Sequence, residues 1–227
     1  MNLQHDTPAS GVTRVLIVED HPLLRERLAQ LINKEADLFV CAEADNIADG
    51  LFLIRSMQPQ LVVLDITLKG PNGLELVKET TAQHLNVTIL IVSMHEEMLY
   101  AERALRAGAK GFISKQEPSE RIVSAIRQVL RGQTYLSPQM TSKIARTFSA
   151  GPSNIAGIAG LTDRELEVFQ LIGCGHTTRE IGARLNLGAS TVETYRGRIK
   201  SKLNLDNATQ LSHEAVRWVQ SSHMSAA

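Results

Sequence analysis

The 227-residue sequence lacks several features that would narrow its class at once. Its two cysteines, Cys41 and Cys174, lie far apart and do not have the spacing of metal ligands. This pattern is typical of a protein of the reducing cytoplasm, so we expect the protein there. No apolar run is long enough to span a bilayer, and the first dozen residues lack the apolar core of a signal peptide, so we expect no membrane partner. Lys plus Arg and Asp plus Glu balance at 24 each, which excludes a chain-wide basic field. Any binding to nucleic acid must therefore come from a local basic patch.

The first half of the chain alternates short apolar runs with amphipathic stretches. Continuous β-branched and leucine-rich runs are typical of strands buried on both faces, and the alternation with helical patterns favours a parallel sheet covered by helices. The sequence therefore predicts an α/β fold, a five-stranded doubly wound sheet of the flavodoxin-like kind, followed by a smaller all-α domain. The expected strands are Val15–Val18, Phe39–Glu43, Leu61–Leu64, Thr88–Ser93 and Gly111–Ser114.

Polar residues follow or end four of these strands. Glu19 and Asp20 follow the first strand, Asp65 the third, and Lys115 the fifth, while Ser93 ends the fourth. Each of them alone is better explained as a solvated loop residue. Ligands of such sheets, however, bind at the carboxyl ends of the strands, and all of these residues reach that edge together. The pattern therefore predicts a site there.

The predicted edge has the chemistry of a phosphoryl-accepting pocket. Carboxylates that are brought together repel one another, and a cation relieves that repulsion. Oxygen ligands at a solvent-facing edge favour Mg²⁺, while Lys115 and the hydroxyl of Ser93 suit phosphoryl oxygens. Asp65, on the central strand, is the best candidate for the nucleophile, because carboxylates form aspartyl phosphates.

These residues resemble the receiver domain of bacterial two-component response regulators. The resemblance rests on VLIVEDH at 15–21, VVLDI at 62–66, Gly73, IVSMHE at 91–96 and GFISK at 111–115. It implies that Asp65 is the phosphoacceptor, and that Mg²⁺ is held by Asp20, Asp65 and the backbone carbonyl of Thr67 with Glu19 nearby. It also implies that Ser93 and Phe112 are the switch pair, and that Lys115 is the lysine typical of the family, which binds the phosphoryl group. Without the resemblance, Phe112 would be interpreted as an ordinary core residue and Ser93 as a buried hydroxyl with no role in a switch.

Two positions depart from the receiver pattern. Lys69 stands where the family usually has proline, and this change could loosen the loop after the third strand. Thr67 is the second residue after Asp65, where the side chain tunes the lifetime of the aspartyl phosphate. The duration of the phosphorylated state is therefore left open.

The second half changes character at residue 133. Proline, serine and glycine punctuate residues 133–160, which we interpret as a linker containing one short helix at Gln139–Phe148. From Leu161 onwards only helical patterns occur: Asp163–Ile172, Thr178–Asn186, Thr191–Leu203 and roughly Asn207–Val219. Three of them follow an S/T-x-x-E capping box, beginning at Thr162, Thr177 and Ser190.

Two of these helices are spaced as a helix-turn-helix, with a glycine-containing turn between them. The second helix places Val192, Ile199 and Leu203 on the core side, and four cations without an acid lie between Arg196 and Lys202. Such a charge run is usually a solvated face, but on this helix contact with DNA phosphates is the better interpretation. The predicted DNA-contacting residues are Thr178, Arg179, Ser190, Thr191, Glu193, Thr194, Arg196, Gly197, Arg198, Lys200 and Lys202.

Residues 161–205 are similar to the LuxR-type DNA-binding domain, so the whole chain resembles a NarL/FixJ-type response regulator. Its expected domains are a receiver at 12–132, a linker at 133–160 and a helix-turn-helix domain at 161–222. Glu193 has two interpretations: it either closes a capping box with Ser190, which we favour, or accepts a hydrogen bond from cytosine N4. Gly197 removes a side chain from a position that can face the groove.

We therefore expect a cytoplasmic transcription regulator that accepts a phosphoryl group from a histidine kinase, dimerises and binds double-stranded DNA. A haloacid-dehalogenase-like phosphatase is an alternative, but its second aspartate is replaced by Thr67, so we expect no enzymatic activity beyond slow self-dephosphorylation. A regulator that works through a protein partner without phosphorylation is a third possibility, which Lys69 keeps open.

Overall fold

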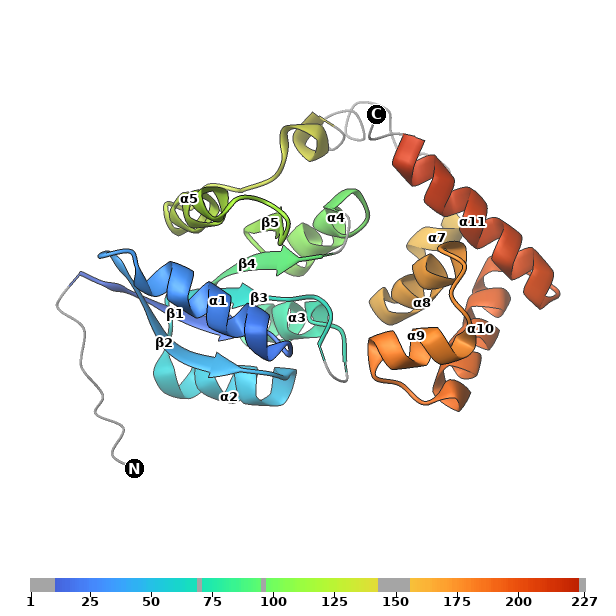
Figure 1. Ribbon diagram of the computed structural model, residues 1–227, viewed down its shortest axis with the longest axis horizontal. Helices are drawn as coiled ribbons and strands as arrows, with labels where there is room; N and C mark the ends of the chain where they lie inside the picture. The colour runs from blue at the N-terminus through green and yellow to red at the C-terminus, as the bar shows by residue number, and fades with distance from the viewer. Residues whose placement is uncertain (1–10, 69–70, 95–96, 143–155, 225–227) are drawn as a thin grey trace. The chain divides into compact units, whose positions relative to one another are not determined.

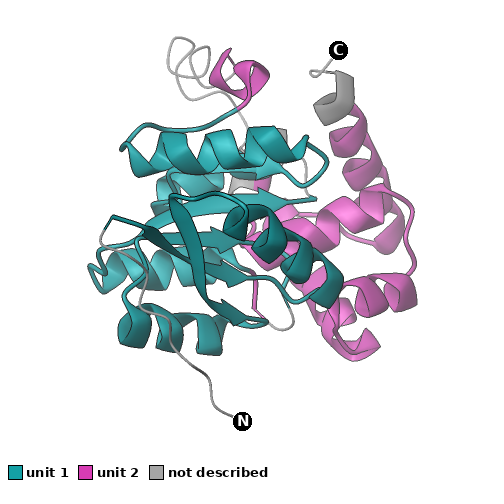
Figure 2. Cartoon of the chain, turned by 60° about the vertical axis from the view of Figure 1, so that its left-hand side comes forward, with its two compact units in different colours: residues 1–68, 73–136 teal, residues 69–72, 137–227 magenta. Residues whose placement is uncertain are grey.

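The computed structural model describes residues 11–68, 71–94, 97–142 and 156–224 (Figure 1). Two compact units divide the chain: residues 1–68 with 73–136, and residues 69–72 with 137–227 (Figure 2). The first four residues of the predicted linker thus belong to the first unit. Lys69, at one of the two departures from the receiver pattern, lies outside the described residues.

The first unit contains the predicted parallel sheet. Its strands lie in the order β2-β1-β3-β4-β5, and every neighbouring pair is parallel. Their bounds are β1 Thr13–Val18, β2 Leu38–Ala44, β3 Leu61–Leu64, β4 Thr88–Ser93 and β5 Gly111–Ser114. The fold prediction is confirmed, and the three strands β3 to β5 have the expected bounds.

Helices cover both faces of the sheet. They are α1 Pro22–Asn33, α2 Ile47–Met57, α3 Leu74–Ala82, α4 Glu97–Ala107 and α5 Ser119–Leu130. α1 and α5 cover one face of the sheet (Figure 1). They share one core with it, which contains Ile32, Ala125, Val63 and Val92. α2 packs against α3 and α3 against α4 on the other face. Because both faces are covered, the central strands β3 and β4 are buried almost throughout, which is why their sequences are continuously apolar. The edge strand β2 is mostly half-buried.

The second unit is helical, with α7 Ala156–Ala159, α8 Asp163–Gly173, α9 Thr178–Leu185, α10 Ala189–Leu203 and α11 Ala208–Met224. Its core is built around Phe169, whose ring centroid lies 5.5 Å from that of Trp218, and includes the fully buried Val192 and Ile199 of α10. No helix in the described residues is long and apolar enough to cross a membrane.

Two of the three predicted capping boxes are present. Thr162 and Glu165 cap α8 reciprocally, and Thr177 and Glu180 cap α9 in the same way. The third prediction is wrong: α10 begins at Ala189, its N-cap is Gly188, and no side chain caps it. Ser190 therefore lies inside the helix. Of the expected linker helix, residues 138–142 are helical and the rest lies outside the described residues.

Candidate functional site

Three carboxylates meet at the carboxyl edge of the sheet. Glu19 and Asp20 follow β1 and Asp65 follows β3, and because these strands are neighbours and parallel, their ends lie side by side. One oxygen of each carboxylate lies within 4.8 Å of the others. Glu19 and Asp65 are buried, whereas Asp20 is half-buried. The structure thus brings together the acidic residues that the sequence singled out.

Lys115, which follows β5, supplies the opposing charge. Its ammonium Nζ donates a hydrogen bond of 2.8 Å to Oδ2 of Asp65 and forms an ion pair with Oε2 of Glu19 at 2.5 Å. Burial lowers the pKa of Lys115, but the attraction of Asp65 and Glu19 outweighs it, so the pKa lies above its ordinary value. Lys115 is therefore held charged in a buried site.

The acidic charge of the pocket exceeds what Lys115 can balance. Burial raises the pKa of the Glu19 carboxyl, and the nearby charge of Asp65 raises it further, against the opposing effect of Lys115. The Oδ1 atom of Asp65 is buried and accepts no hydrogen bond from the described residues. Burial of a carboxylate oxygen without a partner is unfavourable, because the oxygen loses its contact with water. A bound cation would offset this cost. The residues present therefore fit a metal ion held by oxygen ligands.

Ser93 and Phe112 lie on the adjacent strands β4 and β5. Both are fully buried, and Phe112 pairs across the ladder with Ile91, two residues before Ser93. The backbone N–H of Lys115 donates to the carbonyl of Ser93, so the two strand ends that carry Ser93 and Lys115 are joined directly. The two residues of the predicted switch are thus close neighbours of the pocket, in the core and not on the surface.

Gly73 lies directly behind Asp65. A Cβ atom at Gly73 would stand 2.1 Å from the carbonyl oxygen of Asp65 and 3.0 Å from Cα of Ile66. The N–H of Gly73 donates to the carbonyl of Ile66 at 2.7 Å. Only glycine allows the chain to pass this close, because any side chain would push the backbone that carries Asp65 out of place.

Arg25 is a pocket residue that sequence reasoning missed. It lies on the first turns of α1, and its Nη1 donates a hydrogen bond of 2.7 Å to the backbone carbonyl of Glu19. Its Nε lies 3.2 Å from Oε2 of Glu43, which is on β2. In the sequence, Arg25 is only an arginine on the helix that follows an acidic loop. No known spacing pattern predicts that such an arginine binds the backbone of that loop.

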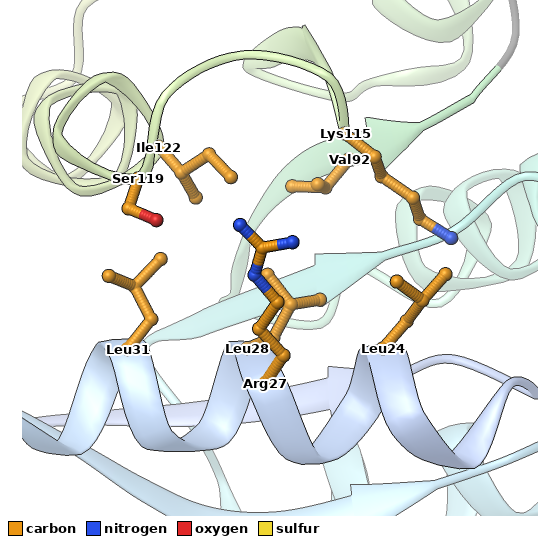
Figure 3. A pocket seen from close by; sticks show the side chains of 8 residues that line it. All are labelled: Leu24, Arg27, Leu28, Leu31, Val92, Lys115, Ser119 and Ile122. Carbon is orange, nitrogen blue, oxygen red and sulfur yellow. The ribbon is translucent and has the colours of Figure 1, made fainter.

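A small cavity lies between α1 and α5, beside the stem of Lys115 (Figure 3). Its volume is about 30 Å³, which holds one or two water molecules but no metabolite. Its lining is mainly apolar and consists of Leu24, Arg27, Leu28, Leu31, Val92, Lys115, Ser119 and Ile122. This cavity is therefore too small to be a substrate site.

The second unit contains the predicted helix-turn-helix. α9 ends at Asn186, a C-cap in the left-handed region with φ 53°. The N–H of Leu187 donates back to the carbonyl of Gly182, and a Cβ on Gly182 would stand 2.7 Å from the oxygen of Leu187. Gly182 therefore allows the tight turn that leads into α10.

The structure exposes most of the predicted DNA-contacting residues and buries none of them. Arg196, Lys200 and Thr178 are half-buried. The exposed ones are Arg179, Ser190, Thr191, Glu193, Thr194, Gly197, Arg198 and Lys202. The cations Arg198 and Lys200 have no ion-pair partner in the described residues, so α10 carries an accessible positive charge.

Lys202 is placed differently from the other cations of α10. Its ammonium donates 2.7 Å to Oε2 of Glu165 and 3.2 Å to the carbonyl of Gly160. Hydrogen bonds from Lys202 and from the capping Thr162 lower the pKa of the Glu165 carboxyl against the effect of burial. The charge of Lys202 thus fastens the end of α10 to the start of α8.

Two modules, a receiver-type acidic pocket and a helix-turn-helix, are thus combined in one chain, and this combination defines a response regulator. Comparison with known proteins supports this class. The family described as response regulator receiver domain matches residues 15–127, and the family described as bacterial regulatory proteins, luxR family, matches residues 159–215.

The chain belongs to the NarL/FixJ-type response regulators with a LuxR-type DNA-binding domain, and relatives that span both domains agree. Response regulator GacA of Pseudomonas aeruginosa is 32% identical over 90% of this chain and 95% of its own. The virulence factors putative positive transcription regulator BvgA of Bordetella pertussis is 35% identical, over 90% and 97%. The crystal structure of a LuxR-family response regulator from Aurantimonas has a TM-score of 0.57 at 33% identity, covering 61% of this chain and 99% of that one.

Proposed function

We propose that Asp65 accepts a phosphoryl group from the phosphohistidine of a histidine kinase, and that this event controls DNA binding by α10. The observation that carries the proposal is the state of the Asp65 carboxylate. One oxygen is fixed by Lys115 at 2.8 Å, while the other is buried and has no hydrogen-bond partner in the described residues. A carboxylate that is held in one orientation, with one oxygen left for a metal ion, is suited to attack phosphorus.

In the proposed step, a carboxylate oxygen of Asp65 forms a bond to phosphorus as the P–N bond to the kinase histidine breaks, and the histidine nitrogen keeps the electron pair. Asp20, Asp65 and the carbonyl of Thr67 would hold Mg²⁺, with Glu19 nearby, and the ion would neutralise charge on the phosphoryl oxygens. Lys115 would bind a phosphoryl oxygen, and Ser93 would donate its hydroxyl to another. The fully buried Phe112 would then repack in the space that Ser93 leaves.

The second half of the proposal concerns output. A phosphorylated receiver would favour a homodimer, whose two copies of α10 would bind a two-fold double-stranded DNA site. The proposal places the protein in the cytoplasm, where such DNA lies. It assigns no multiple-turnover activity to the chain, because no carboxylate follows Asp65 at the position of Thr67, and it limits catalysis to slow loss of the chain's own phosphoryl group.

The test is labelling of the full chain with acetyl phosphate and Mg²⁺, followed by intact mass and by binding to genomic DNA fragments. We expect the wild type to gain one acid-labile phosphoryl group and to bind DNA more tightly. Asp65→Asn should gain none and show no enhancement. Asp206→Asn, an exposed aspartate of the second unit, is the matched control and should behave like the wild type. Unchanged labelling of Asp65→Asn would refute the assignment.

A further inference from the structure

Glu193 is the only acidic residue of α10, and the other charged residues of this helix are cations. The structure excludes the capping role that the sequence favoured for Glu193. A capping box with Ser190 would have occupied the carboxylate at the helix start. Instead α10 begins at Ala189 with Gly188 as N-cap and without a capping side chain. Glu193 therefore lies one turn inside the helix, with its side chain 59% exposed.

The carboxylate of Glu193 is nevertheless held in place. The hydroxyl of Thr178, the first residue of α9, donates a hydrogen bond of 2.6 Å to Oε1 of Glu193. Arg196 Nε lies 3.6 Å from the same oxygen. Both interactions use Oε1, so Oε2 accepts no hydrogen bond from the described part of the chain. One acceptor oxygen is thus fixed in direction before any ligand arrives, which reduces the entropy lost on binding.

The surface next to Glu193 is open. Gly197 lies four residues further along the same face of the helix, and a Cβ atom built there meets no atom within 4 Å. A base edge could therefore approach the helix at this point without meeting a side chain. The opening and the oriented carboxylate lie together on the exposed side of α10.

From this arrangement we propose that Glu193, oriented by Thr178, reads a cytosine in the major groove. The inference rests on the proposed DNA-binding function and adds the base that one position selects. A carboxylate is repelled by DNA phosphates, so it lowers affinity for any duplex unless a base supplies a donor. In the major groove cytosine presents only its N4 amino donor, whereas adenine adds the N7 acceptor beside its amino group, and guanine presents acceptors alone. A single oriented acceptor therefore selects cytosine.

The experiment is selection of binding sites from a randomised duplex library, using the full chain with acetyl phosphate and Mg²⁺. We expect the wild type to select one cytosine in each half-site, and Glu193→Ala to lose about tenfold of that preference while all other positions stay unchanged. Glu193→Gln should move the same position toward adenine, because an amide can pair with both N6 and N7. Thr178→Val should weaken the same preference without moving it.

Glu214→Ala is the matched control, because Glu214 lies on α11 in an (i, i+3) ion pair with Arg217, like that of Glu193 with Arg196. It should select the same sites as the wild type. If Glu193→Ala selects an unchanged sequence, or merely binds all duplexes more tightly, Glu193 is a repulsive charge and the inference is wrong. If the wild type selects no sequence at all, the proposed function itself fails, which is a separate outcome.

Discussion

The guanidinium of Arg25 and the backbone carbonyl of Glu19 are joined by a hydrogen bond of 2.7 Å. Arg25 is in turn held by Glu43, whose carboxylate lies 3.2 Å from its Nε. The loop that carries Glu19 and Asp20 is therefore tied from behind to both α1 and β2. This contact fixes the backbone and leaves the acidic side chains to the pocket.

We therefore predict that Arg25→Ala raises the Mg²⁺ concentration needed for half-maximal labelling of Asp65 by severalfold. The physical reason is that Asp20 is no longer held at a fixed distance from Asp65. Arg25→Lys should recover part of the loss, because an ammonium can still donate to one carbonyl. The measurement is labelling by acetyl phosphate across a Mg²⁺ series. Arg27→Ala, an exposed arginine of the same helix, should leave the series unchanged, and an equal shift there would contradict the role of Arg25.

Glu19→Gln should stabilise the receiver at neutral pH by about 1 kcal/mol, because it removes a buried charge that Lys115 only partly compensates. The folded-state pKa of Glu19 lies above its ordinary value of 4.5, so the folded protein binds more protons than the unfolded chain between 4.5 and that raised value. Wild-type stability therefore falls as pH rises through this window. The advantage of Glu19→Gln should grow over the same window and then level off, which urea unfolding at several pH values would measure. A constant difference at all pH values would argue against a charge effect.

Gly73→Ala should destabilise the receiver by about 2 kcal/mol and sharply slow its labelling, because the new methyl group would stand 2.1 Å from the Asp65 carbonyl oxygen unless the backbone moves. Urea unfolding and the rate of labelling measure the two effects. Gly197→Ala is the control for an added methyl group: it meets nothing within 4 Å and should stabilise α10 slightly. Normal labelling of Gly73→Ala would show that the loop can shift without moving Asp65.

The cations of α10 should divide into two groups. Neutralising Arg198 or Lys200 should weaken binding to all duplexes and reduce the slope of log affinity against log salt by about 1. Lys202→Gln should leave that slope unchanged, because its charge is engaged by Glu165. It should instead cost about 1 kcal/mol of stability, a value reduced for screening because the Lys202 side chain is 38% exposed.

The contribution of this ion pair should also depend on pH. Since the folded-state pKa of Glu165 is lowered, the stabilisation is present above the ordinary value of 4.5 and lost as pH falls through the lower folded value. Urea unfolding of wild type and Lys202→Gln at falling pH should therefore converge. Persistence of the difference in acid would mean that Lys202 stabilises through packing of its stem.

The sequence predicted the sheet well because strands that are buried on both faces are continuously apolar, a pattern that is visible in the sequence. β3 to β5 have the predicted bounds, while β1 and β2 extend beyond them, since Thr13 and Arg14 pair with Leu38 and Phe39 through backbone groups that do not depend on side-chain polarity. The placement of Glu19, Asp65 and Lys115 followed from one rule about the ends of parallel strands.

Other features depend on contacts that no local pattern contains. Ser190 and Glu193 have the spacing of a capping box, but the tight turn between Gly182 and Leu187 starts α10 two residues earlier than that pattern predicts. The bond from Arg25 to a backbone carbonyl has no sequence signature. The ion pair between Lys202 and Glu165 has no sequence signature either, because the two residues are 37 positions apart.

Tyr135 lies in the predicted linker, yet its backbone completes the edge of the sheet. Its N–H donates to the carbonyl of Lys110, and its carbonyl accepts from the N–H of Phe112, so it forms a bridge beside Gly111. A Cβ on Gly111 would stand 3.0 Å from Tyr135, which leaves room only for glycine without adjustment. Hybrid regulators made by exchanging output modules should therefore be joined after Leu136. A junction at Gly132 would leave β5 as a bare edge, open to pairing with other chains.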